Sequence, residues 1–175
     1  MGIYMESIWS MGVKPKNREA LNGNIKTSAA VIGGGLAGIL IAYFLQQSGI
    51  DTVVLEANQI GSGQTKNTTA KISSQHNLIY DKLIKNFGEE KAKQYAYANE
   101  KAISEYRRII KENGIDCDYY DTDCYLYSTE SIKSLEAEEA AAKSLGIDAT
   151  MSCRTDLPFQ IAGALRFSNQ GKLHP

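Results

Sequence analysis

Short apolar runs separated by glycines divide the first part of the chain into a strand, a helix and a second strand. The run Ser28–Ile32 is small and β-branched without alternation, as in a parallel strand covered on both faces. Apolar residues recur at helical spacing from Leu36 to Phe44, and Gly49 marks the end of that helix. A second apolar run, Thr52–Glu56, predicts the next strand. This order predicts a right-handed β-α-β unit.

The remaining pattern departs from that alternation. Polar and hydroxyl-bearing residues dominate 57–76, which predicts a long loop at the carboxyl end of the second strand. Two aromatic-rich runs around Asp121–Asp123 predict a hairpin. Helical spacing and β-branched runs predict, in order, helices over 78–87, 89–113 and 130–145, and strands over 147–151 and 162–167. The stretch from Gly171 to Pro175 is expected to contain no terminal element.

The turn after the first strand carries the spacing G-x-G-x-x-G at Gly33, Gly35 and Gly38. The first glycine allows a sharp turn, the second lets the backbone approach a diphosphate, and the third allows close packing of helix and strand. The helix N-terminus, with the amides of Leu36 and Ala37, would bind the diphosphate. The motif therefore predicts a dinucleotide site.

Glu56 ends the second strand at the distance expected of a ribose-binding acid, and Ala57 follows it. A carboxylate there accepts hydrogen bonds from ribose hydroxyls and repels a 2′-phosphate. The chain then leaves for two long helices and a hairpin. That order favours a flavin-type domain with an inserted second domain over a nicotinamide-type domain, which would continue β-α-β directly. The predicted divisions are an N-terminal arm over 1–27, a nucleotide-binding unit with its polar loop over 28–76, and a second domain over 77–175.

The composition and net charge of the chain limit the kinds of molecule that it is expected to bind. The chain has 175 residues, of which 43% are hydrophobic and 22% charged, which is typical of a globular domain. Its net charge of -1 indicates no general attraction to nucleic acid or to an anionic membrane. The cysteines Cys117, Cys124 and Cys153 lack metal-site spacing, so no metal is expected. Without a signal pattern or membrane-length apolar run, the protein is expected in the cytoplasm, and Trp9 is expected to anchor the arm.

The glycine motif with Ala42, Leu45, Gly49 and Glu56, followed by Gly61-Ser62-Gly63, resembles FAD-dependent oxidoreductases of the D-amino-acid oxidase and glycine oxidase type. The stretches 68–76 and 78–83 are more similar to a bacterial branch that often carries a C-terminal Rieske domain. The resemblance implies FAD, a Rossmann-like FAD domain, an α+β substrate domain, and oxidation of an amine or hydroxyl carbon by hydride transfer to flavin. It further implies that 28–76 is a FAD-binding unit with a flavin loop and that 77–175 is part of the substrate domain. FAD contacts are implied at Ser62, Gly63, Thr65, Thr69 and Ala70.

The chain departs from that family at several points. Thr69-Ala70 stands where the family more often has Ala-Gly, Thr52 where Val is commoner, and Asn77 where the closer branch has Gly. The family also continues well beyond residue 175, so the expected sheet is incomplete and the chain alone is expected to be inactive. Expected partners are the missing C-terminal portion, a further copy of the chain, and, in the full enzyme, an amine or hydroxy-acid substrate.

Two other functions stay open from the residues themselves. One is an NAD-binding dehydrogenase domain, for which Glu56 would favour NAD over NADP. The other is a non-catalytic nucleotide-binding remnant. A catalytic residue is not identified by the pattern: His76, after the loop, is the one candidate, against the plainer interpretation of a structural hydrogen-bonding group.

Overall fold

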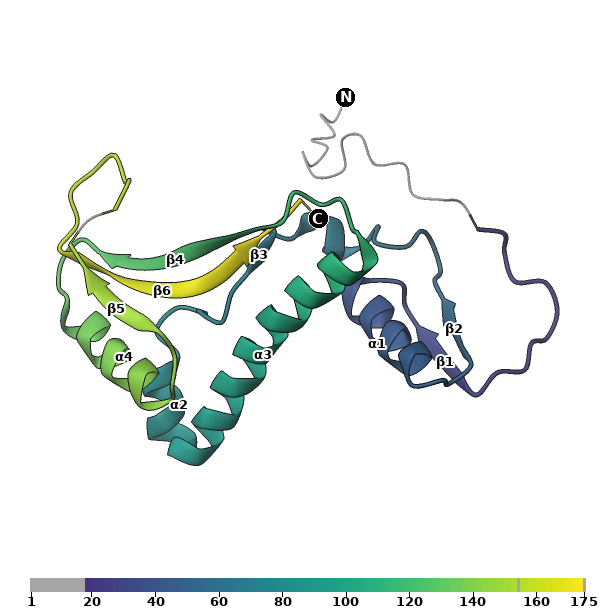
Figure 1. Ribbon diagram of the computed structural model, residues 1–175, viewed down its shortest axis with the longest axis horizontal. Coiled ribbons are helices and arrows are strands. Elements are labelled where there is room, and N and C mark those ends of the chain that lie inside the picture. Colours follow the sequence, from purple (N-terminus) through teal and green to yellow (C-terminus); the bar gives the residue numbers. More distant parts are fainter. Residues whose placement is uncertain (1–17, 154, 175) are drawn as a thin grey trace, which may run out of the picture. The chain divides into compact units, whose positions relative to one another are not determined.

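The computed structural model describes residues 18–153 and 155–174. The chain divides into two compact units (Figure 1), which are described separately. Unit 1 is described over 18–69, and unit 2 over 70–153 and 155–174. Residues 1–17, including Trp9 and most of the predicted arm, lie outside the described residues.

Unit 1 is a β-α-β unit, as the sequence predicts. The strands β1 (Ala29–Ile32) and β2 (Thr52–Leu55) pair in parallel, with Ala29 opposite Thr52 and Ile32 opposite Leu55. The helix α1 (Leu36–Gln47) connects them and lies against both. Gly49 has φ +74° after the helix, a left-handed conformation that suits its predicted role as the helix stop. A short 3₁₀ helix, η2 (Gln64–Asn67), follows in the polar loop.

Unit 2 is an antiparallel sheet with helices. In chain order its elements are β3 (Lys71–Ile72), α2 (Tyr80–Phe87), α3 (Glu89–Asn113), β4 (Tyr120–Ser128), α4 (Lys133–Ser144), β5 (Ala149–Ser152) and β6 (Gly163–Lys172). β6 is the centre of the sheet: β4 pairs along one of its edges, while β5 and β3 pair with opposite ends of the other edge. The predicted fold class is therefore confirmed as a parallel β-α-β unit followed by an α+β region.

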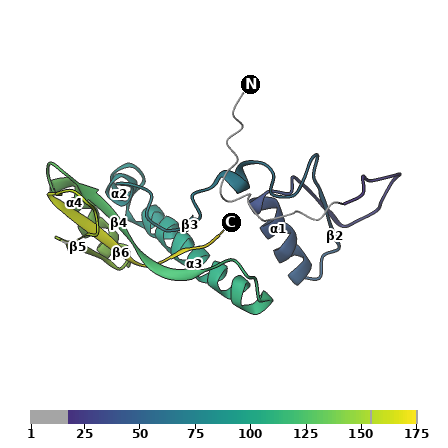
Figure 2. The ribbon, with the colours of Figure 1, turned by 90° about the horizontal axis from the view of Figure 1, so that it is seen from above.

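The core of unit 2 lies between the sheet and its helices. Fully buried Phe167 and Leu165 of β6 pack with Tyr80 of α2, Ala96 of α3 and Leu135 of α4. Figure 2 shows the curved strand β4 and the helix α3, which are tied by the ion pair between Arg107 and Asp121. The helices thus cover one side of the sheet, as the amphipathic spacing of α3 requires.

Two sequence predictions in this unit are wrong in extent. The expected hairpin around Asp121–Asp123 is one continuous strand, β4, with a register shift between Thr122 and Cys124. The three polar residues resemble a turn, but the Asp121 carboxylate accepts hydrogen bonds from Arg107 and Tyr119, which lets it lie in a strand. The last strand, β6, also runs beyond Phe167 to Lys172. Within it Asn169 has φ +60°, which accommodates the shift in register between β6 and β4.

A buried polar network fixes the segment that leads into α2. Glu138 of α4 is fully buried, and its carboxylate accepts the amides of Ile79 and Tyr80 at 2.8 Å and of Asp81 at 3.0 Å. It therefore caps α2 from a different helix. The Tyr80 hydroxyl donates to the Ser74 carbonyl at 2.6 Å, and the Ser74 amide donates to Oε1 of Gln170 at 2.7 Å.

Candidate functional site

The glycine turn of unit 1 has the geometry that its spacing predicts. Gly33 has φ +100°, a conformation that other residues rarely adopt, and its amide donates to the Leu55 carbonyl at 2.8 Å. A Cβ atom on Gly38 would lie 2.0 Å from the Gly33 carbonyl oxygen. The turn and the close approach of α1 to β1 therefore depend on these two glycines.

Gly35 stands at the N-terminus of α1 with extended φ and ψ of -77° and 179°. A Cβ atom added to Gly35 would lie 3.4 Å from Thr65 Oγ1, an ordinary contact distance. Glycine at this position therefore leaves open space, and it is not required to avoid a steric clash. The first amides of a helix have no carbonyl partner within it. The Leu36 amide instead donates to the Thr65 hydroxyl of η2 at 2.9 Å.

Glu56 is tied to the same turn. Its carboxylate accepts the Gly34 amide at 2.7 Å and the Asn58 amide at 2.9 Å. These backbone hydrogen bonds, from Asn58 first and Gly34 second, hold the pKa of Glu56 below its ordinary value. The carboxylate is therefore ionised at neutral pH, and it retains acceptor positions beyond the ones that the amides use.

A hollow of about 390 Å³ joins the turn, the helix N-terminus, the acid and the loop. Seven of the twelve predicted cofactor contacts line it: Gly35, Leu36, Ala37, Glu56, Ser62, Gly63 and Thr65. The structure thus brings together residues that lie up to 30 positions apart in the chain because β2 returns beside β1 and the loop folds back over α1.

The other predicted contacts lie elsewhere. Gly33 and Gly38 shape the turn but do not line the hollow. Ala57 is exposed and lines a different hollow of unit 1, whereas Thr69 is exposed at the end of that unit. Ala70 is buried in unit 2, where its carbonyl accepts the Leu173 amide at 3.1 Å.

Four residues that the sequence analysis did not select also line the hollow: Asn58, Gly61, Gln64 and Thr68. Gly61 has φ +75°, and its amide donates to the Gly34 carbonyl at 2.9 Å, which joins the loop to the glycine turn. The Gly-Ser-Gly run was a usable signal for Gly61. Asn58 contributes its backbone amide to the site, and no sequence pattern identifies such a backbone contribution.

Two departures from the resembled family have a structural explanation. Ala70 and Asn77 stand where that family has glycine, and both have positive φ, 56° and 60°. The chain thus keeps a left-handed conformation at both positions without glycine. The conformation costs Ala about 1–2 kcal/mol, and Asn less, because its short polar side chain tolerates this region.

His76, the candidate catalytic residue, is an exposed residue of unit 2. Its Nε2 lies 3.4 Å from Oδ1 of Asn99, and its ring meets the Tyr95 ring edge to face at 6.5 Å between centroids. These contacts fit the plainer interpretation of a structural group and supply no acid or base partner. Its catalytic role stays a prediction.

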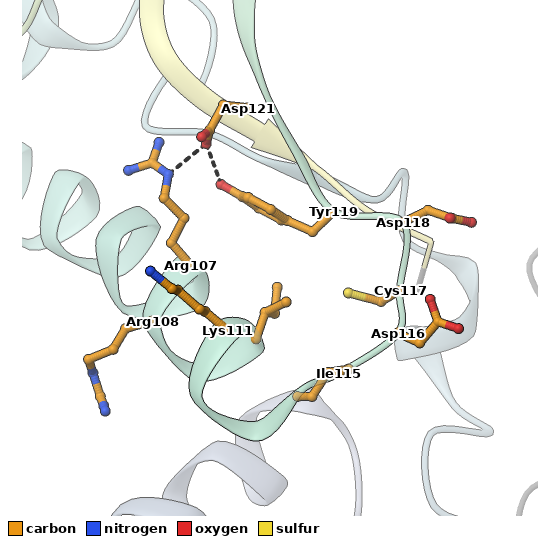
Figure 3. A pocket seen from close by; sticks show the side chains of 10 residues that line it. Arg107, Arg108, Lys111, Ile115, Asp116, Cys117, Asp118, Tyr119 and Asp121 are labelled. Atoms are coloured by element: carbon orange, nitrogen blue, oxygen red, sulfur yellow. Dashed lines mark hydrogen bonds and ion pairs between the residues drawn. The ribbon is translucent and has the colours of Figure 1, made fainter.

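Unit 2 has a hollow of about 670 Å³ between the end of α3 and the segment that leads into β4 (Figure 3). Its guanidinium groups are already engaged: Arg107 binds Asp121, and Arg108 binds Glu105 and Glu112. Burial raises the pKa of the Cys117 thiol, which disfavours the reactive thiolate. This hollow offers neither a phosphate cradle nor an activated nucleophile.

Two classes of site find no support in the described part of the chain. None of its helices is long and apolar enough to cross a membrane. Residues 18–153 and 155–174 contain no group of three or more His, Cys, Asp or Glu side chains placed to hold a metal ion.

Comparison with known proteins identifies relatives that match most of the chain. A family model described as DAO, FAD dependent oxidoreductase, matches residues 28–175. The putative Rieske 2Fe-2S iron-sulfur protein YhfW of Bacillus subtilis (strain 168) is 35% identical over 172 residues, 97% of this chain and 34% of that protein. Gamma-glutamylputrescine oxidoreductase of Escherichia coli (strain K12) is 27% identical over 164 residues, 90% of this chain and 38% of that protein.

Solved structures share the fold. L-amino acid deaminase from Proteus myxofaciens superposes with a TM-score of 0.66 at 15% identity, over 93% of this chain and 37% of that one. The enzyme from Proteus vulgaris superposes with a TM-score of 0.61 at 16% identity, over 89% and 37%. The chain therefore spans between a third and two fifths of the length of these relatives.

Proposed function

Because the chain belongs to the DAO family of FAD-dependent oxidoreductases, we propose that residues 28–76 form its FAD-binding part and that unit 1 holds the ADP half of FAD. The observation that carries the proposal is the hollow lined by Gly35, the first residues of α1 and the Glu56 carboxylate. It combines a helix N-terminus with an acid at the end of the neighbouring strand.

The residues of the hollow fit the two ends of an ADP group. The N-terminus of α1 has no acidic residue in its first turn, so its amides and positive dipole end favour a diphosphate. Gly35 presents backbone without a side chain to that space. Glu56 is ionised and can accept ribose hydroxyls, and the same charge disfavours a 2′-phosphate.

The order of strands favours FAD over NAD. An NAD-binding domain continues with a further parallel strand after the first β-α-β unit. Here the next strand, β3, belongs to unit 2 and pairs antiparallel with β6. The chain therefore leaves the nucleotide-binding unit after β2, as in a flavin domain with an inserted second domain.

Bound flavin supplies a hydride acceptor, and we assign the full-length enzyme to oxidation of an amine or hydroxyl carbon. Within unit 1, the α1 amides would bind the diphosphate, Glu56 would orient the ribose, and Ser62, Gly63 and Thr65 would extend the contact along the loop. Thr69 lies outside the hollow and stays a contact that the resemblance implies. Ala70 of unit 2 stays a contact that the resemblance implies, and His76 of unit 2 stays a candidate from its place after the loop. Residues 77–175 form part of the substrate domain.

Titration of the purified chain with FAD, followed by flavin fluorescence and calorimetry, tests this function. We expect Gly35→Val to abolish binding, since its side chain would occupy the hollow while φ of -77° stays accessible to Val. Glu56→Gln should weaken binding about tenfold or more through lost charge-assisted hydrogen bonds.

The control is Glu136→Gln, which makes the same change at an exposed acid of α4 in unit 2. Circular dichroism of each variant verifies that the fold is kept. Binding of NAD but not FAD, or equal FAD affinity of the parent and Gly35→Val, would show that the hollow does not hold the ADP half of FAD.

A further inference from the structure

Unit 2 has another hollow, of about 970 Å³, beside the face of its sheet that the helices leave open. Its lining residues come from β4 and from the stretch between β5 and β6, at Cys153 and over 155–161. Figure 1 shows the loop 155–162 rising from the end of the sheet on the side away from α4. The volume lies within the range of small-molecule sites in proteins, about 300–1,000 Å³.

β4 presents two tyrosines to this hollow. Cys124 and Leu126 pack against the core of unit 2, and side chains alternate along a strand, so Tyr125 and Tyr127 point to the opposite face of the sheet. Tyr125 is 42% exposed and Tyr127 46% exposed. Exposed apolar side chains that gather in one patch are typical of a binding site.

Phe159 of the loop forms an aromatic corner with Tyr127. The two ring centroids lie 5.6 Å apart, and the ring planes meet at 58°. The Ala162 amide donates to the Ser128 carbonyl at 2.7 Å, which fixes the loop to β4 shortly after Phe159. Phe159 is 48% exposed, so its contact with Tyr127 leaves much of the ring open. The faces of aromatic rings are electronegative and attract cations.

Asp156 adds a negative charge to the aromatic corner. It is exposed, and among the described residues that line the hollow it is the only charged one. No ion pair with Asp156 is found in the described part of the chain. Arg166, which faces Tyr125 across the strands, pairs with Asp123 at 3.6 Å and does not line the hollow. The described lining therefore favours a cation over an anion.

We propose that this hollow binds an organic ammonium ion of low molecular weight, whose nitrogen carries methyl or methylene groups. The charged head lies against Tyr127 and Phe159 and beside Asp156, and its carbon atoms contact Leu157 and Ile161. A metal ion fits less well, because a single carboxylate supplies fewer oxygen ligands than a hard cation requires. Binding there involves unit 2 alone and is independent of FAD binding in unit 1.

Titration of the chain with choline in the absence of FAD, followed by NMR of the aromatic rings, tests the site. We expect saturable binding with a dissociation constant on the order of 1 mM, and shifts of the ring signals of Tyr127 and Phe159. Dimethylbutanol, which has carbon in place of the nitrogen of choline, should bind about fivefold more weakly because it lacks the charge. Ammonium chloride at the same ionic strength should cause no saturable shift.

Two substitutions separate the charge from the rings. Asp156→Asn should weaken choline binding about fivefold and leave dimethylbutanol binding unchanged, since it removes a charge and keeps the shape. Tyr127→Leu should also weaken choline binding about fivefold, because it removes a ring face. The matched controls are Asp148→Asn and Tyr97→Leu, at exposed residues of unit 2 outside the hollow, and both should bind choline as the parent does.

Equal affinity for choline and dimethylbutanol, or no saturable binding of choline, would overturn the proposal. Equal losses in the two control variants would overturn it too, because they would show that the hollow is not the binding site. A trimethyl-lysine peptide that binds more tightly than choline would identify a protein as the partner in place of a small molecule. Since FAD is left out of these titrations, their failure would leave the nucleotide site of unit 1 untouched.

Discussion

The two units differ in where their apolar residues lie. In unit 2 the buried hydrophobic residues gather between sheet and helices, with Tyr80, Leu165 and Phe167 almost fully removed from water. In the described part of unit 1, Gly34 is the only buried residue. Unit 2 thus has a core of its own, while unit 1 has the apolar sequence of a core without the layers that would enclose it.

Sequence polarity explains the difference. α3 of unit 2 interrupts its apolar stripe with Lys, Glu and Arg, so one side suits water and the other the sheet. α1 has no charged residue at all. Unit 1 therefore leaves apolar side chains exposed, and its candidate nucleotide site depends on backbone geometry at glycines, which needs little burial.

The largest test of this comparison removes an aromatic ring from each unit. Phe167→Ala should lower the free energy of unfolding of unit 2 by about 3–5 kcal/mol, because it leaves a cavity in a close-packed core. Phe44→Ala, at a ring that is 43% exposed on α1, should cost less than about 1 kcal/mol. Urea denaturation followed by circular dichroism measures both, and equal losses would contradict the contrast between the units.

The next test addresses the buried carboxylate of unit 2. Glu138→Ala removes the acceptor of three backbone amides and should cost about 3 kcal/mol, because buried donors without a partner lose their hydration. Glu136→Ala, at an exposed acid two residues earlier on α4, is the control and should be nearly neutral. If thermal unfolding shifts equally in both variants, the cap does not stabilise α2.

A smaller effect of opposite sign is expected at the first residue of unit 2. Ala70→Gly should raise the free energy of unfolding by about 1 kcal/mol, because glycine adopts φ of 56° without steric cost. Ala98→Gly, at an exposed interior position of α3, should lower it by about 1 kcal/mol. Denaturant midpoints of the two variants should therefore move in opposite directions from that of the parent.

The smallest expected effect concerns pH. The pKa of Glu56 in unit 1 is lowered by backbone amides, and that of Asp121 in unit 2 by Arg107 first and Tyr119 second. A lowered folded-state pKa contributes stability above the ordinary value, 4.5 for Glu56 and 3.8 for Asp121, and that stability is lost as the pH falls through the folded value.

Carbon-13 titration of the two carboxyl groups checks this prediction. High salt should raise the pKa of Asp121 toward its ordinary value, because its pair with Arg107 is exposed and screened. The Glu56 pKa should change less, since fixed amides lower it through short hydrogen bonds. A larger salt response at Glu56 would contradict the assigned causes.

Much of the fold was predictable because it depends on local chemistry. The G-x-G-x-x-G spacing indicated the β1 to α1 turn, since Gly33 and Gly38 occupy positions that other residues would strain or fill. The bounds predicted for the long helix, about 89 to 113, match those of α3, because Gly88 and Gly114 flank it. Within the site, the acid and the loop could be selected, but Asn58, which contributes a backbone amide, could not.

The sequence by itself thus determined the β-α-β unit, its helix ends and the residue types of the candidate dinucleotide site, because glycine conformations and helical periodicity are properties of short segments. Only the tertiary structure decided that Asp121–Asp123 continues a strand, that Glu138 caps α2 and that the hollow of unit 1 includes Gly61 and Thr68. Each of these depends on a partner distant in the chain: Arg107 and β6 for the strand, α4 for the cap, and α1 for the loop. No local pattern reports such a partner, because its position follows from how whole elements pack.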